Sequence, residues 1–349
     1  MDPYLAFVRN ARPGGLGIER RRPSENMGAG DLLCRTQIAG VCGTDLQILR
    51  GLRNDRAAVL GHEGVAVVET VFATSDQSMT GQPVVINPTS PITGIAELGH
   101  TEDGLMQEIF VVPARLRNQT LRALPGLNPH LAVLVEPLSS VLMALSVMQR
   151  IHQPRSVLIV GRGTIGHLFR ISLPRSFKSV ENIVVAGTAG QEVVARSSFD
   201  TVILCANCDR AAAALHIGVH ALGPKGLVYL FGGIPKDYSD PRFPRVSLSA
   251  VRFHNSGAIG QDPIGMRVTL SGGFAVTIAG SRGASNQDMV NAMQELIANA
   301  SAYRGLLTVV SEPSVALRLL RDAIENPLQR KWIKLAIDMR TWSQHAGGV

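Results

Sequence analysis

Cysteine is scarce in this sequence. The 349 residues contain four, which are Cys34, Cys42, Cys205 and Cys208. Four cysteines are too few for a disulfide scaffold in a chain of this length, and they are consistent with a reducing compartment. The amino-terminal stretch also lacks an apolar segment after a basic start, so no secretory signal peptide is expected. We therefore expect a cytoplasmic protein.

Aromatic residues and long apolar runs are also few. Aromatic side chains make up 5% of the chain, and no run reaches the ~18 apolar residues of a membrane span. The net charge is +7, but the densest basic run, Arg20-Arg21-Arg22, has no interleaved aromatic residue and no recognition motif. We expect this run to lie in a solvated loop, and we expect no nucleic acid and no membrane as a partner.

Charged residues are 17% of the chain and hydrophobic residues 45%, which excludes a disordered protein. A chain of this length favours two domains. The first third contains short apolar runs separated by Gly, Pro and Asn, which indicates a β-rich domain. From about residue 151, buried strands alternate with helical segments, which indicates a parallel sheet with covering helices. The expected strands are residues 65–68, 84–86, 109–112, 156–160, 183–185, 200–204, 227–230, 275–278 and 333–337.

The predicted fold class is therefore α/β, with a Rossmann-type doubly wound parallel sheet and a second, β-rich domain. Residues 1–150 form the first part of the β-rich domain, and residues 151–284 form the Rossmann-type domain. Residues 285–349 return to complete the β-rich domain, beginning with a helix over residues 286–299, where apolar residues recur at helical spacing.

A G-x-G-x-x-G motif directly follows one of the buried strands and precedes a helical stretch. In this setting the first glycine permits a tight turn, the second lets the backbone approach a pyrophosphate, and the third permits close packing of helix on sheet. A glycine-rich turn with no ligand is the alternative, but the strand–turn–helix context favours a dinucleotide site. The motif reads Gly161-Arg162-Gly163-Thr164-Ile165-Gly166.

A second group of residues combines a thiol, an imidazole and carboxylates. Cys42, His62, Glu63 and Glu136 together offer a plausible catalytic zinc set with one position open for water or substrate. Taken singly, each has a plainer interpretation. Cys42 could be a small buried side chain, His62 a hydrogen-bonded core residue, and Glu136 a carboxylate at a helix start.

The joint occurrence of these motifs resembles the medium-chain dehydrogenase/reductase family of zinc-containing alcohol dehydrogenases, particularly its polyol and threonine dehydrogenase branches. The motifs follow the family's order at about its spacing. They are Gly40-Val41-Cys42-Gly43-Thr44-Asp45, the stretch from Gly61-His62-Glu63-Gly64 to Val67, Glu136-Pro137-Leu138, and the glycine loop at Gly161 to Gly166. The likeness covers most of the chain but is thin over residues 175–200 and 235–275.

The resemblance implies a GroES-like catalytic domain in which Cys42 and His62 ligate zinc. Glu63 and Glu136 compete for the remaining protein position. Asp45 would orient His62, and Thr44 would take the alcohol proton. The resemblance further implies that zinc acts as a Lewis acid on the substrate oxygen while hydride passes to the nicotinamide. A homodimer or homotetramer is implied as well.

Two departures from the family pattern concern metal binding and proton transfer. Relatives with a structural zinc carry four closely spaced cysteines after the third strand, but residues 87–104 contain none, so we expect one catalytic zinc and no structural zinc. His100 in this stretch is expected to be an ordinary surface histidine. Gln47 occupies the position of the family's proton-relay histidine, and an amide cannot carry a proton at neutral pH. Cys205 and Cys208 have no second pair to bind zinc with them, so we expect core or loop cysteines.

The cofactor is the remaining departure. An NAD-specific fold places an acidic residue at the end of the second strand to bind the ribose diol. Here the strand ends in Ala186-Gly187-Thr188, and we include Gly187 and Thr188 among the cofactor-binding residues. The missing carboxylate favours NADP over NAD, with Arg162 and Arg196 as candidate phosphate partners.

The sequence thus predicts a zinc-dependent NAD(P)-linked oxidoreductase that interconverts a secondary alcohol and its ketone. The alcohol or ketone substrate is expected to be a small molecule such as a polyol, cyclitol or amino alcohol. Two alternatives stay open. One is a zinc lyase or isomerase that holds the cofactor without net turnover, and the other is a ligand-binding subunit that retains only the fold.

Overall fold

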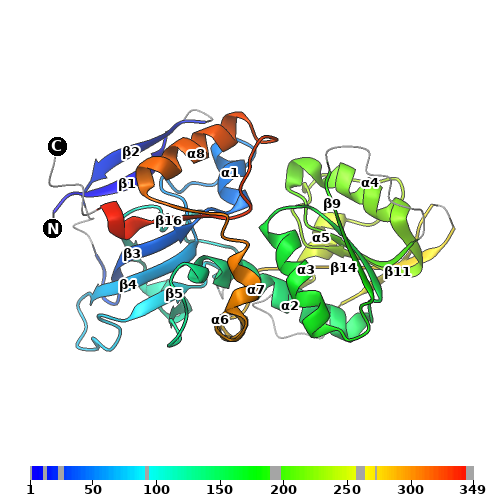
Figure 1. The fold of residues 1–349 in the computed structure, drawn as a ribbon, viewed down its shortest axis with the longest axis horizontal. Helices are drawn as coiled ribbons and strands as arrows, with labels where there is room; N and C mark the ends of the chain where they lie inside the picture. The colour runs from blue at the N-terminus through cyan, green and yellow to red at the C-terminus, as the bar shows by residue number, and fades with distance from the viewer. Residues whose placement is uncertain are drawn as a thin grey trace. The chain divides into compact units, whose positions relative to one another are not determined.

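The computed structural model describes residues 2–10, 14–22, 27–90, 94–188, 198–256, 264–271 and 273–342. The chain divides into two compact units (Figure 1). Unit 1 comprises Met1–Pro137 and Asn286–Val349, and unit 2 comprises Leu138–Ser285. The first division falls inside a helix, α2, and thus 13 residues before the boundary expected after residue 150.

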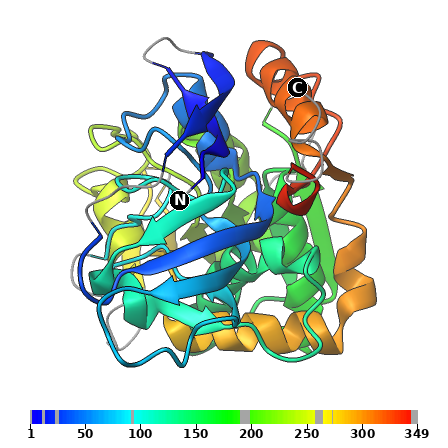
Figure 2. The same ribbon diagram turned by 90° about the vertical axis from the view of Figure 1, so that its left-hand side faces the viewer.

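Unit 1 is built on a seven-stranded sheet in the order β15-β16-β3-β4-β5-β7, with β6 also paired to β3. Strand β16 comes from the end of the chain and pairs antiparallel with β3 from its beginning, so the terminal segment completes the sheet. Figure 2 looks onto these strands. Their bounds are β3 Leu32–Gly40, β4 Glu63–Val71, β5 Pro83–Ile86, β6 Ile109–Val112, β7 Thr120–Arg122, β15 Val309–Ser311 and β16 Leu335–Asp338.

The core of unit 1 lies between this sheet and the segments that cover it. Buried aliphatic side chains of β3, β4, β5 and β16 form one hydrophobic cluster with residues of the helices. Helix α8 contacts α1, β2 and β16, and its apolar positions face that cluster. The helices of this unit are α1 Gly43–Leu49, α6 Asn286–Ala298, α7 Ala300–Arg304 and α8 Pro313–Glu325, with the 3-10 turns Ala114–Gln119, Leu131–Leu134 and Met339–Thr341.

A separate antiparallel hairpin joins β1, Tyr4–Arg9, to β2, Leu16–Arg21. The expectation that the basic run lies in a loop is wrong for Arg20 and Arg21, which end β2. The Arg21 guanidinium forms an ion pair with Asp103 at 2.5 Å, and the two side chains are about one-third exposed. Backbone pairing with β1, in which Arg20 lies opposite Leu5 and Arg21 opposite Tyr4, places these residues in a strand.

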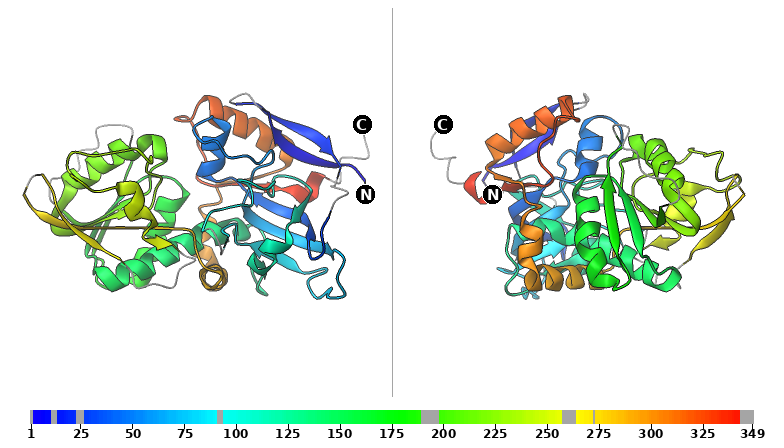
Figure 3. Two further views of the ribbon diagram at one scale, coloured as in Figure 1. Left: turned by 180° about the vertical axis from the view of Figure 1, so that it is seen from behind. Right: turned by 45° about the vertical axis from the view of Figure 1, so that its right-hand side comes forward.

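Unit 2 contains a second seven-stranded sheet, in the order β12-β14-β11-β10-β8-β9, with β13 antiparallel to β14. All the other pairs are parallel. Helix α3 packs on β8 and β9, α4 packs on β8, β10 and β11, and α5 packs on β11 and β14 (Figure 3). The strands are β8 Ser156–Val160, β9 Asn182–Ala186, β10 Phe199–Leu204, β11 Leu222–Leu230, β12 Asn255–Ser256, β13 Met266–Thr269 and β14 Ala275–Arg282, and the helices are α3 Thr164–Ser176, α4 Ala211–Ala221 and α5 Leu248–Phe253, with the 3-10 turn Cys208–Arg210.

The order of the strands creates a switch point in this sheet. Strand β8 has β9 on one side and β10 on the other, so successive connections from it leave in opposite directions. Ligands of open α/β sheets bind outside the carboxyl ends of the strands at such a point. The predicted fold class, a doubly wound parallel sheet plus a β-rich domain, is confirmed.

Helix α2, Val135–Ile151, continues the 3-10 turn before it. Together they form a segment, Leu131–Ile151, that is long and apolar enough to cross a membrane by length and composition. Within its apolar window, 83% of the residues are buried inside the protein. A buried core helix has the same composition, so the segment is weak evidence for a membrane span.

Candidate metal and dinucleotide sites

Three strand ends meet at one edge of the unit 1 sheet. In the antiparallel register, Gly40 at the end of β3 faces Glu63 at the start of β4 and Ala336 near the start of β16. The residues that follow β3, precede β4 and precede β16 are therefore brought together, although they are distant in the sequence. They include Cys42, His62 and Lys334.

Gly40 makes the close approach of these segments possible. A Cβ built on Gly40 would lie 3.1 Å from Cε of Lys334 and 3.2 Å from Oε2 of Glu63, and closer still to Val133. Any larger side chain would push these groups apart. The first glycine of the motif is thus explained by packing around the site.

Cys42 lies directly before helix α1, and Asp45 connects it to His62. The backbone N–H of Cys42 donates a hydrogen bond to Oδ2 of Asp45 at 2.8 Å, and Oδ1 of Asp45 lies 3.8 Å from Nδ1 of His62. Asp45 is fully buried, and His62 is 5% exposed. One carboxylate therefore fixes the segment that carries the thiol and faces the imidazole, as the predicted orienting role requires.

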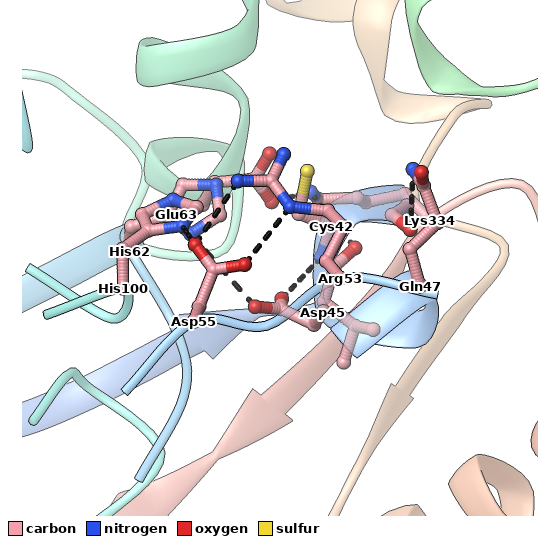
Figure 4. Close-up of polar contacts among 11 residues, drawn as sticks. Cys42, Asp45, Gln47, Arg53, Asp55, His62, Glu63, His100 and Lys334 are labelled. Atoms are coloured by element: carbon pink, nitrogen blue, oxygen red, sulfur yellow. Dashed lines mark hydrogen bonds and ion pairs between the residues drawn. The ribbon is translucent and has the colours of Figure 1, made fainter. Parts of the chain in front are cut away.

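The thiol of Cys42, a ring nitrogen of His62 and a carboxylate oxygen of Glu63 all lie within 4.8 Å of one another. Nδ1 of His62 and Oδ1 of Asp45 are buried and have no hydrogen-bond partner among the described residues. The Cys42 thiol and the His62 ring interact with each other, since His62 lowers the pKa of the thiol and Cys42 raises that of the imidazole. Figure 4 shows these side chains around the sulfur atom.

The charges of this group are unbalanced. Burial raises the pKa of the Cys42 thiol, and the nearby Glu63 carboxylate raises it further. Burial also raises the pKa of Asp45, against the effect of His62. Burial alone would lower the pKa of His62, but Cys42, Asp45 and Glu63 raise it well above its ordinary value. The Lys334 ammonium pairs with Glu63, and the Cys42 thiol and Asp45 share the imidazole, so a divalent cation would supply further positive charge at the site. Thiolate, imidazole and carboxylate are the donors of catalytic zinc sites, and the residues fit a zinc ion.

Glu136 lies in the first turn of α2 and is outside the group of three atoms. Burial raises the pKa of Glu136 to about 7, with Glu63 acting in the same direction and with His62 and Lys334 opposing it. Its carboxyl group is therefore electrostatically part of the site. The geometry leaves both Glu63 and Glu136 available as the remaining protein ligand.

Lys334 is a site residue that sequence reasoning missed. Its ammonium forms a hydrogen-bonded ion pair with Glu63 and donates a second hydrogen bond to the carbonyl oxygen of Val41 at 3.1 Å. Both side chains of the pair are 1% exposed. A lysine within the apolar run that ends the chain was the available signal, because a lysine is almost never fully buried without a partner.

The two residues of the proposed proton path lie on helix α1. Thr44 is half-buried, two residues after Cys42. Gln47 is buried, and its side-chain amide donates a hydrogen bond to the carbonyl oxygen of Gly43 at 3.4 Å. The Gln47 side chain is thus bonded to the backbone of its own helix.

The prediction that His100 is a surface histidine is wrong. His100 is 6% exposed, and its ring lies beside that of His62 with a centroid separation of 4.8 Å and an interplanar angle of 33°. Its Nδ1 lies 2.9 Å from Oδ1 of Asp55. Backbone pairing of a loop with the segment before His62 buries it, and that pairing has no signature in the local sequence.

The glycine motif of unit 2 forms the turn from β8 to α3, at the switch point of the sheet. Gly161 has a φ of 137°, and its N–H donates a hydrogen bond to the carbonyl oxygen of Ala186, at the end of β9. A Cβ on Gly166 would overlap the Gly161 carbonyl oxygen, whereas one on Gly163 would meet nothing within 4 Å. These are the tight turn, the close packing and the open approach that a pyrophosphate site uses.

Arg162 lies against the end of the second strand. A Cβ built on Gly187 would lie 3.7 Å from Cδ and 3.8 Å from Nη1 of Arg162, so the guanidinium covers Gly187. Ala186, Gly187 and Thr188 carry no carboxylate. The predicted partner Arg196 lies outside the described residues.

The remaining cysteines of unit 2 stand at the edge of this turn. Cys205 directly follows β10 and donates its backbone N–H to the carbonyl oxygen of Val160 at 2.8 Å, and Cys208 begins a 3-10 turn. Burial raises the pKa of the Cys205 thiol. A thiol that stays protonated is a poor metal ligand and nucleophile.

Comparison with known proteins adds to this geometry. Residues 28–120 match the model of the alcohol dehydrogenase GroES-like domain. Starvation-sensing protein RspB of Escherichia coli (strain K12) is 29% identical over 196 residues, which is 50% of this chain and 55% of that protein. D-altritol 5-dehydrogenase of Agrobacterium fabrum is 26% identical over 188 residues, or 48% of this chain and 54% of that protein. The chain thus spans about half the length of the curated relatives it matches.

The likeness of the folds extends over the whole chain. The crystal structure of galactitol-1-phosphate dehydrogenase from Escherichia coli superimposes with a TM-score of 0.70, covering 96% of this chain and 100% of that one. The two sequences are 17% identical, so this likeness concerns the fold.

Proposed function

Because this chain belongs to the medium-chain dehydrogenase/reductase family, we propose that it is a zinc-dependent oxidoreductase that interconverts a secondary alcohol and its ketone with NAD(P). The observation that carries the proposal is the approach of Cys42, His62 and Glu63 within 4.8 Å of one another. A second observation supports the proposal. The turn from β8 to α3 has the glycines of a pyrophosphate site, and it lies at the switch point of the parallel sheet of unit 2.

Cys42 and His62 would hold the metal, with Glu63 or Glu136 as the further protein ligand. When bound, zinc supplies a Lewis acid for the substrate oxygen and NAD(P) supplies the hydride acceptor. Oδ1 of Asp45 lies 3.8 Å from Nδ1 of His62 and would favour a proton on that nitrogen, which would leave Nε2 for the metal. The Thr44 hydroxyl, carried two residues after Cys42, takes the proton of the alcohol.

The substrate class that we propose is a polyol, cyclitol or amino alcohol, taken up as a small molecule. Support comes from the relatives, of which one is named D-altritol 5-dehydrogenase and another 2-dehydro-3-deoxy-L-galactonate 5-dehydrogenase. The solved neighbours include galactitol-1-phosphate dehydrogenase and L-idonate 5-dehydrogenase. Three of these four names give position 5, an internal carbon of a six-carbon chain and therefore a secondary carbinol.

NADP is the cofactor that we propose in preference to NAD. The second strand of unit 2 ends without a carboxylate, which removes the group that would bind a ribose diol and repel a 2′-phosphate. The guanidinium of Arg162 lies at that strand end, over Gly187. An arginine there is suited to a phosphate because its planar fork donates paired hydrogen bonds.

We propose a homodimer or homotetramer that acts in the cytoplasm. The family resemblance supports the assembly, and the low cysteine content supports a reducing compartment. Light scattering on the purified protein measures the oligomeric state. Fractionation of the source cells measures the localisation.

The test is reduction of NADP and NAD by the purified, zinc-loaded protein, followed at 340 nm with a panel of polyols, cyclitols and amino alcohols. Cys42→Ser serves as the control that removes the metal site. Turnover of a secondary alcohol that is lost in Cys42→Ser would support the proposal. Tight zinc and cofactor binding with no turnover of any alcohol in the panel would instead favour the lyase or isomerase, or the ligand-binding subunit.

A further inference from the structure

His100 lies against a proposed metal ligand without being a member of the ligand group. Its ring is 4.8 Å from the ring of His62, at an interplanar angle of 33°. Two flat rings at this separation make an offset contact that favours one relative orientation. The orientation of the His62 ring is therefore coupled to that of His100.

The His100 ring is itself anchored by Asp55. Nδ1 of His100 lies 2.9 Å from Oδ1 of Asp55, and the Asp55 carboxylate accepts two hydrogen bonds from Arg53, at 2.9 and 3.0 Å. Burial would raise the pKa of Asp55, but the hydrogen bonds from His100 and Arg53 hold it well below its usual range. Since Asp55 is a carboxylate, Nδ1 of His100 carries the proton and donates it to the hydrogen bond.

The backbone around His100 is fixed to the segment that leads into His62. The carbonyl oxygen of His100 accepts hydrogen bonds from the N–H groups of Arg56 and Ala57, both at 2.8 Å. Oδ1 of Asp103 accepts from the N–H groups of Ala58 and Val59 at 2.8 and 2.9 Å. These four bonds run along the chain toward His62, so that His100 and His62 are parts of one rigid piece.

We propose that His100 is a positioning residue for the metal site, which holds the His62 imidazole beside Cys42 with Nδ1 facing Asp45. The inference rests on the proposed function in that it requires a metal at Cys42 and His62. Stacking fixes the plane of the His62 ring, and the bond to Asp55 fixes the plane of His100. The Arg53 side chain is bonded to Asp55 and is partly exposed. The contacts that run from His62 through His100 and Asp55 therefore end at the protein surface.

Two metal-binding measurements test the role. The first is the affinity for Zn²⁺, measured by competition with a chromophoric chelator. The second is the visible spectrum of the Co²⁺-substituted protein, which reports the geometry of the ligands. Unlike activity, both measurements report on the metal site directly and require no substrate. Thermal unfolding of the metal-free protein gives the structural contribution separately.

We expect His100→Ala to weaken Zn²⁺ binding by about 10-fold, the lower end of what loss of an outer hydrogen-bonding partner costs. The Co²⁺ absorption bands should shift. His216→Ala, which removes an exposed histidine from helix α4, is the matched control and should leave both readouts unchanged. His100→Phe keeps a flat ring beside His62 but loses the bond to Asp55, and it should give a smaller loss of affinity with shifted Co²⁺ bands. If His100→Ala does not fold, His100→Phe is the variant that tests the positioning role.

The outcomes separate this inference from the function on which it rests. A parent protein that binds neither Zn²⁺ nor Co²⁺ would overturn the proposed function, and the inference with it. A parent that binds both metals, with His100→Ala matching it in affinity and spectrum, would overturn the inference alone; where His100→Ala does not fold, a match by His100→Phe would do so. A fall in thermal stability without any change in metal binding would give His100 a purely structural role, and would overturn it as well.

Discussion

Lys334 and Glu63 form an ion pair in which each side chain is 1% exposed, at the point where the last strand of the chain meets the start of β4. A buried ammonium is expensive to desolvate, and its hydrogen bonds to Glu63 and to the Val41 carbonyl are what offset that cost. The pair joins the two chain regions that make up unit 1. It also places a positive charge beside a proposed metal ligand.

Lys334→Met should therefore destabilise the metal-free protein by about 3 kcal/mol or more, because it leaves Glu63 buried without its partner. Urea unfolding measures this. Lys334→Met combined with Glu63→Gln removes both charges and should recover part of the loss. If the double variant is as unstable as Lys334→Met, the isolated charge is not the cause, and the packing of the lysine stem around Gly40 accounts for the effect.

We expect one zinc ion per chain. The three atoms of Cys42, His62 and Glu63 form the metal-ligand group found among the described residues, and residues 87–104 contain no cysteine. Elemental analysis of the loaded protein should give one zinc, and Cys42→Ala should lose it. Two tightly bound zinc ions per chain, or undiminished affinity in Cys42→Ala, would contradict this.

The local motifs predicted a group that contains Cys42, His62 and Glu63, and the structure brings these three residues within 4.8 Å of one another. The capping interaction between Cys42 and Asp45 spans three residues, and the β8 turn is read directly from Gly161, Gly163 and Gly166. Lys334 and His100 were not predictable in the same way. Lys334 reaches Glu63, 271 positions away, through the register of β16 on β3. His100 is buried by the pairing of two loops, and loops carry no periodic pattern from which pairing could be inferred.

Substitutions of Thr44 and Gln47 should have very different effects on turnover. Thr44→Val keeps the shape of the side chain but deletes the hydroxyl, and turnover should fall by roughly the 10²–10⁴-fold typical of a lost acid–base group. Zinc content should not change. Gln47→Ala should have far less effect, since the Gln47 amide bonds to the Gly43 carbonyl. Gln47→His could restore a titratable group and raise the rate below neutral pH. Full activity of Thr44→Val would exclude the proposed proton acceptor.

Asp240 provides a pH-dependent contribution to the stability of unit 2, away from the metal site. It is 5% exposed and accepts hydrogen bonds from the Tyr238 hydroxyl at 2.9 Å and from Nε of Arg242 at 2.7 Å. Burial would raise the pKa of Asp240, but the Arg242 and Tyr238 hydrogen bonds lower it. A lowered carboxyl pKa stabilises the fold at pH values above the ordinary value of about 3.9, and this stabilisation is lost as the pH falls through the folded pKa.

Asp240→Asn should thus lower the free energy of unfolding by more at pH 7 than at pH 3, because the stabilisation begins to be lost below the ordinary carboxyl pKa of about 3.9. Urea unfolding at the two pH values measures the difference. An equal loss at both would mean that the Asp240 charge contributes nothing, and that only the shape of the side chain matters.

The choice of cofactor depends on Arg162, whose guanidinium covers Gly187 at the end of β9. If it pairs with a 2′-phosphate, Arg162→Ala should weaken NADPH binding by about 10-fold or more, since a hydrogen bond to a charged group is worth about 1.5–3 kcal/mol. NADH lacks the phosphate, so its affinity should change little. Arg175→Ala, in the last turn of α3, the helix that follows Arg162, is a matched control and should affect neither.

Gly187→Asp completes the test in the opposite direction. It places a carboxylate where NAD-specific folds have one, next to the Arg162 guanidinium, and should shift the preference toward NADH. Nicotinamide fluorescence during titration with NADH and NADPH measures all four proteins. The parent should bind NADPH at least as tightly as NADH. A tenfold preference of the parent for NADH, equivalent to about 1.4 kcal/mol, would mean that another residue binds the ribose diol and that Arg162 does not select the cofactor.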